Sequence, residues 1–524
     1  MSTPGAYFRL LKAGWILSRE GVFAALPGDQ LTGPANLAWR VSRLIARRRA
    51  KAESRSDRMS KAVDRLGPSY VKLGQFLATR PDVVGADVAM DLAELQDRMS
   101  TFPRATAIAS IEGSLGRTID DLYVEFGEPI AAASIAQVHP AQIERDGLRT
   151  KVAVKAIRPG VRRRFFNDLE SFFLAARMQE RYMPASRRLR PVEVTRMLAQ
   201  STKIEMDLRL EAAALSELGE NIKDDPGFRV PWVDWERTGR DVVTMEWIEG
   251  IKMSDIEALR TAGHDLDALS VTVIQSFLRH TLRDGFFHAD MHPGNLFVEP
   301  DGTIVAVDLG IVGRLGKKER RFLAEILYGF IRRDYVRVAE VHFEAGYVPP
   351  IHDVHAFAQA IRAIGEPIHG QPAETISMAR LLALLFEVTE IFDMQARPEL
   401  VLLQKMMVVV EGVARNLNPS FNMWKAAEPV VGDWIRDNLG PRGYLEDARD
   451  GVLALASLAR QVPELAARTE KLSREIDVMV EKGLRFDEET AQAIGRSEAR
   501  HTRSGRIALW VIAATLFWIA LQLS

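Results

Sequence analysis

The chain has 524 residues, of which 47% are hydrophobic and 27% charged, and this length suggests about two to four globular domains. Its 69 Lys and Arg residues nearly balance its 70 Asp and Glu residues, so the net charge of -1 provides no general attraction to nucleic acid. The absence of cysteine excludes disulfides, cysteine-ligated zinc, iron–sulfur clusters and thiol catalysis.

The first 57 residues are expected to form amphipathic and basic helices. Apolar residues recur there at helical spacing, and charged residues interrupt them, so the segment does not resemble a secretory signal peptide. Between residues 40 and 55, seven basic residues accompany one acid. This stripe is either a solvated helix face or a contact for anionic lipid headgroups.

Helical and strand patterns alternate along the rest of the chain. The β-branched run 151–157 ends at Pro159-Gly160 and predicts a strand, and residues 228–248 contain two more strand-like runs. One helix is expected from Glu193 to Gly219. A loop-and-strand patch at 287–313 interrupts an otherwise helical stretch.

These patterns predict an α+β protein with two lobes around a cleft. The expected parts are N-terminal helices at 1–57, a helical extension at 58–125, an N-lobe at 126–250, a C-lobe at 251–425, amphipathic helices at 426–504 and a transmembrane tail at 505–524.

The tail is the one long apolar segment. From Ile507 to Leu523 only Thr515 and Gln522 are polar, and these 17 residues would form a helix about 25 Å long, which is close to the thickness of a bilayer core. Arginines precede the segment, so the positive-inside rule predicts a single-pass tail with the body on the cytoplasmic side. A buried core helix is the alternative.

The sharpest motif runs from His288 to Asn295 and is followed by Asp308 directly after a strand-like run. Mg²⁺-dependent phosphoryl transfer needs two acids and an amide placed in this way. Asp308 would bind a metal that bridges phosphates, Asn295 would supply an amide oxygen to a metal, and Asp290 would orient or deprotonate the acceptor. The spacing between Asp290 and Asn295 equals that of the protein-kinase catalytic loop.

Three further elements stand in kinase order. Val152-Ala-Val-Lys155 matches the strand whose lysine holds the α- and β-phosphates, and Glu211 is the candidate ion-pair partner of Lys155. The run that ends in Glu246-Trp-Ile248 fits the hinge, where backbone groups bind adenine. Together these elements predict a protein-kinase-like fold.

Two features distinguish the chain from ordinary protein kinases. An alanine-rich loop, Ala131-Ala-Ala-Ser134, occupies the place of the glycine-rich phosphate loop, and alanine lacks the backbone freedom of glycine. Lys72-Leu-Gly-Gln75 lies upstream on an extra helix, and Glu205-Met-Asp207 precedes Glu211 on what we expect to be the same helix. With the catalytic-loop and Asp308-Leu-Gly310 motifs, these segments resemble the UbiB-type atypical kinase family associated with ubiquinone biosynthesis, most clearly over residues 60–320.

The resemblance implies a site and a role. In such proteins the helix with Lys72 and Gln75 folds over the cleft and contacts the residue matching Glu205, and we group Asp207 with these as regulatory. ATP and Mg²⁺ are the implied cofactors, with modest ATPase activity at a membrane, near quinone-precursor lipids or the enzymes that process them. The expected nucleotide contacts are Ile130, Ala131, Ala132, Ala133, Ser134, Ile135, Ala136, Gln137, Val138, Lys155, Glu246 and Ile248.

Two other functions stay open. A small-molecule phosphotransferase of the aminoglycoside or choline kinase type also carries a catalytic loop with this spacing, but it lacks the helix with Lys72. A nucleotide-binding scaffold without turnover is the second alternative, against which the intact set of Lys155, Glu211, Asp290, Asn295 and Asp308 argues.

Overall fold

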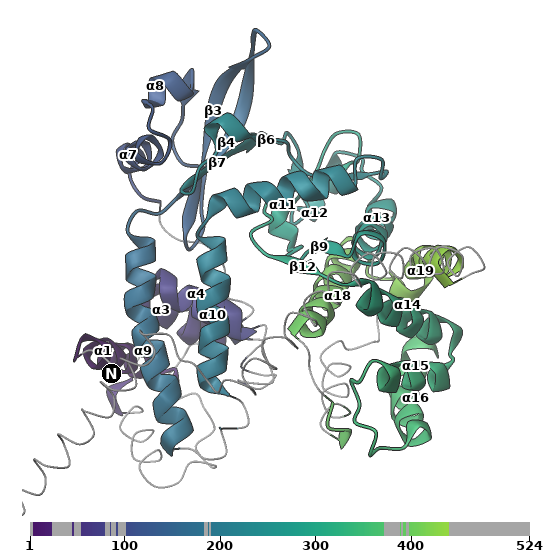
Figure 1. Cartoon of the computed structure of the whole chain (residues 1–524). Helices are drawn as coiled ribbons and strands as arrows, with labels where there is room; N and C mark the ends of the chain where they lie inside the picture. The colour runs from purple at the N-terminus through teal and green to yellow at the C-terminus, as the bar shows by residue number, and fades with distance from the viewer. Residues whose placement is uncertain are drawn as a thin grey trace, which may run out of the picture. The chain divides into compact units, whose positions relative to one another are not determined.

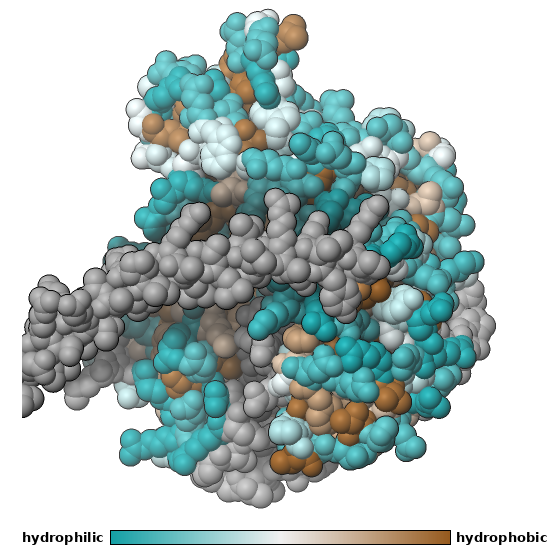
Figure 2. Space-filling view, turned by 45° about the vertical axis from the view of Figure 1, so that its right-hand side comes forward, coloured by the Kyte–Doolittle hydropathy of each residue, from teal (hydrophilic) through white to brown (hydrophobic). Residues whose placement is uncertain are grey.

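The computed structural model of the chain describes residues 4–23, 44–46, 54–78, 84, 88, 91–92, 101–182, 187, 190–370, 388, 391–394 and 398–439. The chain divides into two compact units, 1–436 and 437–524, and the site described below lies in the first. Over the face seen in Figure 2, the described residues are mainly hydrophilic, with smaller apolar areas between them.

Helices α1 (Pro4–Arg19), α3 (Arg55–Leu66) and α4 (Pro68–Ala78) form the described part of the N-terminal extension (Figure 1). Helix α3 begins where the Ser54 side chain accepts a hydrogen bond from the Asp57 N–H, and it ends at Gly67, whose φ of 97° suits glycine. Met59, Val63 and Val71 of these helices share a small apolar core. Long helices α9 (Val161–Tyr182) and α10 (Pro191–Glu205) pack against each other, and α1 and α4 pack against α9.

A six-stranded sheet follows, in the order β1-β3-β4-β7-β6 with β2 paired to β3. Its members are β1 (Glu125–Phe126), β2 (Ala131–Ala132), β3 (Ala136–Arg145), β4 (Leu148–Ile157), β6 (Val233–Asp234) and β7 (Val242–Glu246). Strand β4 is longer than the predicted run 151–157 because it pairs with β3 along its whole length.

The two faces of β4 have different neighbours. Val152 and Val154 pack into a core that includes Ile111 of α7 (Arg104–Leu115) and Leu122 of α8 (Ile119–Leu122). Side chains alternate along a strand, so Lys155 points to the other face, where α11 (Leu208–Asn221) lies.

The expected helix from Glu193 to Gly219 is wrong, because the structure has two helices there. Helix α10 ends at Glu205, and α11 begins at Leu208 after the cap residue Asp207. The Asp207 carboxylate accepts the Arg209 N–H and thereby starts the second helix. The motif Glu205-Met-Asp207 is therefore a helix break, not part of one helix with Glu211.

The C-terminal part contains two small sheets. One has the order β5-β11-β10-β8, and β12 pairs with β9 in the other. The strands are β5 (Phe228–Arg229), β8 (Ile251–Lys252), β9 (Phe286–His288), β10 (Leu296–Val298), β11 (Ile304–Ala306) and β12 (Val312–Arg314). The helices are α12 (Ile256–Thr261), α13 (Leu266–Arg279), α14 (Lys317–Arg332), α15 (Tyr335–Glu344), α16 (Val354–Gly370), α18 (Pro398–Leu417) and α19 (Met423–Leu439), with short helical turns η5 (His280–Asp284) and η6 (Pro293–Asn295). A further turn, η4 (Trp235–Arg237), joins β6 to β7 of the six-stranded sheet.

The arrangement confirms the predicted α+β, kinase-like fold. The exact domain boundaries stay predictions. Within the described ranges, no helix is both long and apolar enough to cross a bilayer. The expected transmembrane tail at 505–524 and the amphipathic stretch beyond residue 439 lie outside the described residues.

Candidate functional site

Three predicted site residues meet at one point. The Lys155 ammonium on β4 donates to both carboxylate oxygens of Glu211 on α11, at 2.7 and 2.9 Å. The same ammonium donates to Asp308 Oδ2 at 2.9 Å. The fold thus brings together residues separated by 56 and 153 positions in the sequence.

The charges of this cluster control one another. Burial raises the pKa of Glu211 to about 7, although the Lys155 ammonium opposes that shift. Burial alone would also raise the pKa of Asp308, but Lys155 lowers it to about 2. Burial acts to lower the pKa of Lys155, and the Asp308 and Glu211 carboxylates outweigh it and raise that pKa. Asp308 is therefore ionised and Lys155 charged at neutral pH.

The loop after β9 is held by its own hydrogen bonds. The Asn295 Nδ2 donates to the Asp290 carbonyl oxygen at 3.1 Å and to Asp290 Oδ2 at 3.4 Å. His288 is buried, and its Nδ1 accepts the Asp290 N–H at 3.2 Å. The His292 side chain accepts the Gly294 N–H and caps the turn η6. These histidines brace the loop on which Asp290 and Asn295 lie.

Asn295 and Asp308 lie at the same end of the β10–β11 hairpin. Leu296 pairs with Ala306, and the Val307 N–H donates to the Asn295 carbonyl oxygen at 3.0 Å, so the next residue, Asp308, follows directly beside the loop. The Gly310 N–H donates to Asp308 Oδ1 at 3.0 Å, which fixes this carboxylate.

The donors at this end of the hairpin fit a magnesium ion. Among the residues that the structure describes, no group of three or more His, Asp or Glu side chains could hold a metal alone. Mg²⁺ is usually held by one or two protein oxygens together with phosphates and water. The Asp308 side chain is 38% exposed, and the Asn295 amide nitrogen is engaged with Asp290, so a carboxylate and an amide oxygen are the available hard ligands.

The alanine-rich segment forms a tight hairpin between β2 and β3. The Ile130 and Ala133 N–H groups donate to carbonyl oxygens of β3, and Ser134, Ile135 and Ala136 are buried. The predicted nucleotide contacts at residues 130–138 therefore lie on a closed turn with part of its backbone already paired. Whether this hairpin contacts a nucleotide stays a prediction.

The Gln137 side chain has a structural role that the sequence did not indicate. It is fully buried, accepts the Phe102 N–H at 2.9 Å and donates to the Phe102 carbonyl oxygen at 3.2 Å. Its amide also contacts His139, which hydrogen-bonds to the Gly127 carbonyl. This chain of contacts ties β3 to the segment before α7.

The predicted hinge begins at the end of β7. The Glu246 N–H donates to the Trp232 carbonyl oxygen at 3.0 Å, and the chain then continues through Ile248 to β8. The Glu246 carboxylate binds the Arg229 guanidinium, with distances of 2.8 and 3.0 Å. Sequence reasoning missed Arg229, because nothing in its local pattern signals a partner 17 positions away.

The residues expected to regulate the cleft do not form one cluster. Lys72 on α4 forms an ion pair with Glu205 at the end of α10, and both side chains are largely buried, with 14% and 9% exposed. Gln75 lies one turn further along α4 and is partly buried. Asp207 instead caps α11 and binds the Arg209 guanidinium.

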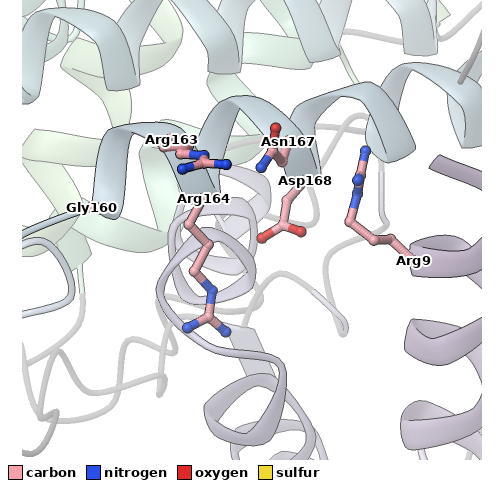
Figure 3. A pocket seen from close by; sticks show the side chains of 6 residues that line it. All are labelled: Arg9, Gly160, Arg163, Arg164, Asn167 and Asp168. Atoms are coloured by element: carbon pink, nitrogen blue, oxygen red, sulfur yellow. The ribbon is translucent and has the colours of Figure 1, made fainter. Parts of the chain in front are cut away.

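A cavity of about 290 Å³ lies away from this cluster, between α1 and the first turns of α9 (Figure 3). Arg9 of α1 faces Arg163, Arg164 and Asn167 of α9 across it, and Asp168 projects between the arginines. The lining has three arginines and one acid, and the Arg9 guanidinium is also paired with Glu170 at 3.0 Å, so the excess positive charge comes from α9.

Comparison with known proteins identifies both main parts of the chain. The ABC1 atypical kinase-like domain matches residues 94–342, and the UbiB helical domain matches residues 361–422.

Several curated relatives are similar over most of their length. A "Probable protein kinase UbiB" of Marinobacter nauticus is 38% identical over 462 residues, covering 87% of this chain and 84% of the relative. The protein of that name from Aeromonas hydrophila is 38% identical, and the match covers 90% of this chain and 87% of the relative. The one from Klebsiella pneumoniae strain 342 is 36% identical, and the match covers 96% of this chain and 91% of the relative. A solved Mycobacterium tuberculosis protein in complex with erythromycin is 24% identical, covers 72% of this chain and 98% of its own, and has a TM-score of 0.48.

Proposed function

Since the chain belongs to the UbiB family of ABC1-type atypical kinases, we propose that it binds Mg-ATP, hydrolyses it slowly and thereby supports ubiquinone biosynthesis at a membrane. A phosphoryl acceptor other than water is not needed for this proposal.

The observation that carries the proposal is the Lys155–Glu211–Asp308 cluster. In phosphoryl-transfer enzymes of the kinase type, an intact lysine–glutamate pair and a metal-binding aspartate must be in place together. The Lys155 ammonium lies within 3 Å of both carboxylates, so all three side chains meet in one cluster. A degenerate nucleotide-binding scaffold would have no reason to keep this geometry.

Each side chain has a distinct part in the proposed chemistry. Lys155 holds the α- and β-phosphates, and Glu211 keeps the ammonium in position. Asp308 and Asn295 would hold Mg²⁺, and the bound ion would neutralise charge on the phosphates. Asp290, held by Asn295 and by the loop around His288, orients the attacking water and accepts its proton.

Two features support a membrane location. The sequence at 505–524 is apolar enough for a transmembrane tail, although it lies outside the described residues. Helix α1 buries small residues and exposes large apolar ones. Ala6 and Ala13 are buried, whereas Phe8 and Leu11 are 71% and 73% exposed.

The outer face of α1 resembles an interfacial anchor. Tyr7 and Trp15, each 52% exposed, flank Phe8 and Leu11 on this face, and aromatic residues favour the boundary between lipid and water. The positive cavity next to α1 (Figure 3) suits the phosphate of an anionic lipid headgroup. A protein held in this way would meet quinone precursors, which are confined to the bilayer, or the enzymes that process them.

Thermal unfolding with and without Mg-ATP tests the nucleotide proposal. A ligand at a hundredfold excess over its dissociation constant stabilises the folded state by about 2.7 kcal/mol. We expect this stabilisation in the wild type and in Asp301→Asn, an exposed control in the β10–β11 turn, but not in Asp308→Asn. Equal stabilisation of Asp308→Asn would contradict the site, and no stabilisation of the wild type would contradict Mg-ATP binding.

A further inference from the structure

Arg229 lies between two carboxylates that belong to different sheets. Its guanidinium donates to Glu246 at 2.8 and 3.0 Å, and to Glu299 at 2.8 and 2.6 Å. Glu246 ends β7 of the six-stranded sheet, whereas Glu299 follows β10 of the four-stranded sheet. One side chain therefore joins both sheets through two bidentate contacts.

Two short segments of the chain cross directly between these sheets. Strand β5 pairs with β11 in the four-stranded sheet, and β6, only a few residues later, pairs with β7 in the six-stranded sheet. The predicted hinge crosses in the opposite direction, from β7 to β8, which pairs with β10. The connection between the sheets is thus a pair of antiparallel segments, 229–233 and 246–251.

Hydrogen bonds tie the two crossings together near Arg229. The Glu246 N–H donates to the Trp232 carbonyl oxygen at 3.0 Å, and the Trp232 N–H donates to Glu246 Oε2 at 3.3 Å. At the far end of the hinge, Gly250 lies so close to the next sheet that an added Cβ would come within 2.7 Å of the Val298 carbonyl oxygen. The hinge is fixed at both ends, by the Glu246 contacts and by this close approach.

We propose that Arg229 is a positioning residue that locks these two crossings and thereby sets the geometry of the hinge backbone at which adenine binds. The proposal rests on the proposed Mg-ATP site and goes beyond it, since it assigns a residue that fixes the backbone of the hinge. Arg229 touches no reacting group and acts through Glu246.

The partial burial of the three side chains makes this contact more than a surface ion pair. Arg229, Glu246 and Glu299 are 34%, 22% and 20% exposed. The carboxylates raise the pKa of Arg229, so the guanidinium is permanently charged. Removing it leaves two partly buried carboxylates facing each other, and their repulsion pushes the crossings apart.

Hydrogen exchange of the Trp232 and Glu246 backbone amides, which form the hydrogen bonds between the two crossings, tests the lock directly in the full chain without nucleotide. In Arg229→Met we expect exchange there to be at least about tenfold faster, and binding of Mg-ATP about tenfold weaker, which corresponds to about 1.4 kcal/mol. Arg229→Lys should restore part of both effects, because lysine is a point charge without the planar fork of arginine.

Arg314→Met is the matched control. Arg314 makes a bidentate pair with Glu217, at 2.7 and 2.5 Å, on β12 rather than at the hinge. The Arg314→Met variant should change neither the amide exchange at the hinge nor the affinity for Mg-ATP. If Arg229→Met does not fold, Glu299→Gln removes one half of the contact and should accelerate the same amides to a smaller extent.

Unchanged exchange at the Trp232 and Glu246 amides in Arg229→Met would overturn the lock, as would a uniform acceleration over the whole chain, which is the result of lower global stability. Faster exchange with unchanged Mg-ATP affinity would overturn the positioning role. If the wild type binds no Mg-ATP, the proposed function fails, while the lock is still judged by the exchange alone.

Discussion

The Lys72 ammonium and the Glu205 carboxylate form an ion pair between the N-terminal extension and the end of α10. Glu205 is also close enough to Glu211 for its negative charge to contribute to the raised pKa of that residue, after burial and the Asp308 carboxylate. Two lysine–glutamate pairs, Lys72–Glu205 and Lys155–Glu211, are therefore electrostatically coupled.

Breaking the first pair should release α4. In Lys72→Met, Glu205 would be left largely buried without its cation, and amide exchange over residues 68–78 should become about tenfold faster or more. The family resemblance implies that α4 covers the cleft, and on that basis we expect ATP hydrolysis to rise. Lys72→Arg should keep most of the contact.

Arg196→Met is a suitable control for this measurement. It removes an exposed ion pair with Glu193 on the same helix as Glu205. If amide exchange over residues 68–78 in Lys72→Met stays as slow as in the wild type, then packing against α9, and not the ion pair, holds α4 in place.

Asp290→Asn should reduce the turnover number for ATP and leave the KM nearly unchanged. Asparagine can keep the hydrogen bond to Asn295 but cannot accept a proton, and loss of a general base typically costs a factor of about 10² to 10⁴. Steady-state ATPase assays of the purified protein measure both constants. Full turnover in Asp290→Asn would remove the assigned role, and the absence of turnover in the wild type would favour the scaffold.

Glu211 should make the stability of the protein depend on pH near neutrality. Its pKa is raised from 4.5 to about 7 in the folded state, so between these values the folded chain holds a proton that the unfolded chain has lost. Retention of this proton stabilises the folded state. The stabilisation is fully present below pH 4.5 and is lost as the pH rises through about 7.

The variant Glu211→Gln lacks this titration. Relative to the wild type, its free energy of unfolding should therefore increase as the pH rises from 4.5 to 7, and urea unfolding at several pH values measures the difference. A constant difference over this range would show that Lys155 keeps Glu211 ionised throughout.

The motifs that carry the chemistry could be predicted from the sequence because they are local. Lysine on a β-branched strand, Asp290 and Asn295 in one loop, and Asp308 after a strand each have a recognisable pattern, and their order indicated the fold. The pairing of Lys155 with Glu211 followed from that order, and the structure shows this contact. The contact of Lys155 with Asp308 was not predicted.

The features that could not be predicted depend on contacts between residues that are not local in the sequence, or on a helix cap. The break at Met206 was hidden because both flanking segments have helical periodicity, and only the cap by Asp207 reveals it. The contacts of Arg229 with Glu246 and Glu299 arise from sheet topology, which no local pattern encodes. The contact of Gln137 with Phe102 is of the same kind.

The exposed face of α1 should contact lipid. The chain has no cysteine, so Leu11→Cys labelled with an environment-sensitive fluorophore gives a single probe on that face. With vesicles that contain anionic phospholipid, the emission should shift to shorter wavelength and increase. Leu148→Cys is the control, because Leu148 is 70% exposed at the β3–β4 turn, where we expect no lipid contact. Equal shifts at both sites, or none at residue 11, would contradict an α1 anchor.

Removal of residues 505–524 should impair quinone production without loss of nucleotide binding. The tail would confine the protein to the membrane that holds the quinone precursors, whereas all proposed nucleotide contacts lie at residues 130–308. In cells that depend on this protein, we expect the quinone content to fall, while the purified truncated chain keeps its stabilisation by Mg-ATP.

An unrelated apolar helix of equal length, fused at residue 504, distinguishes anchoring from a specific role of the tail. Restored quinone production would show that the tail acts through membrane confinement alone. Unchanged quinone content after simple truncation would contradict the membrane-tail proposal. The α1 contact is then judged by its own fluorescence measurement, because that experiment does not depend on the tail.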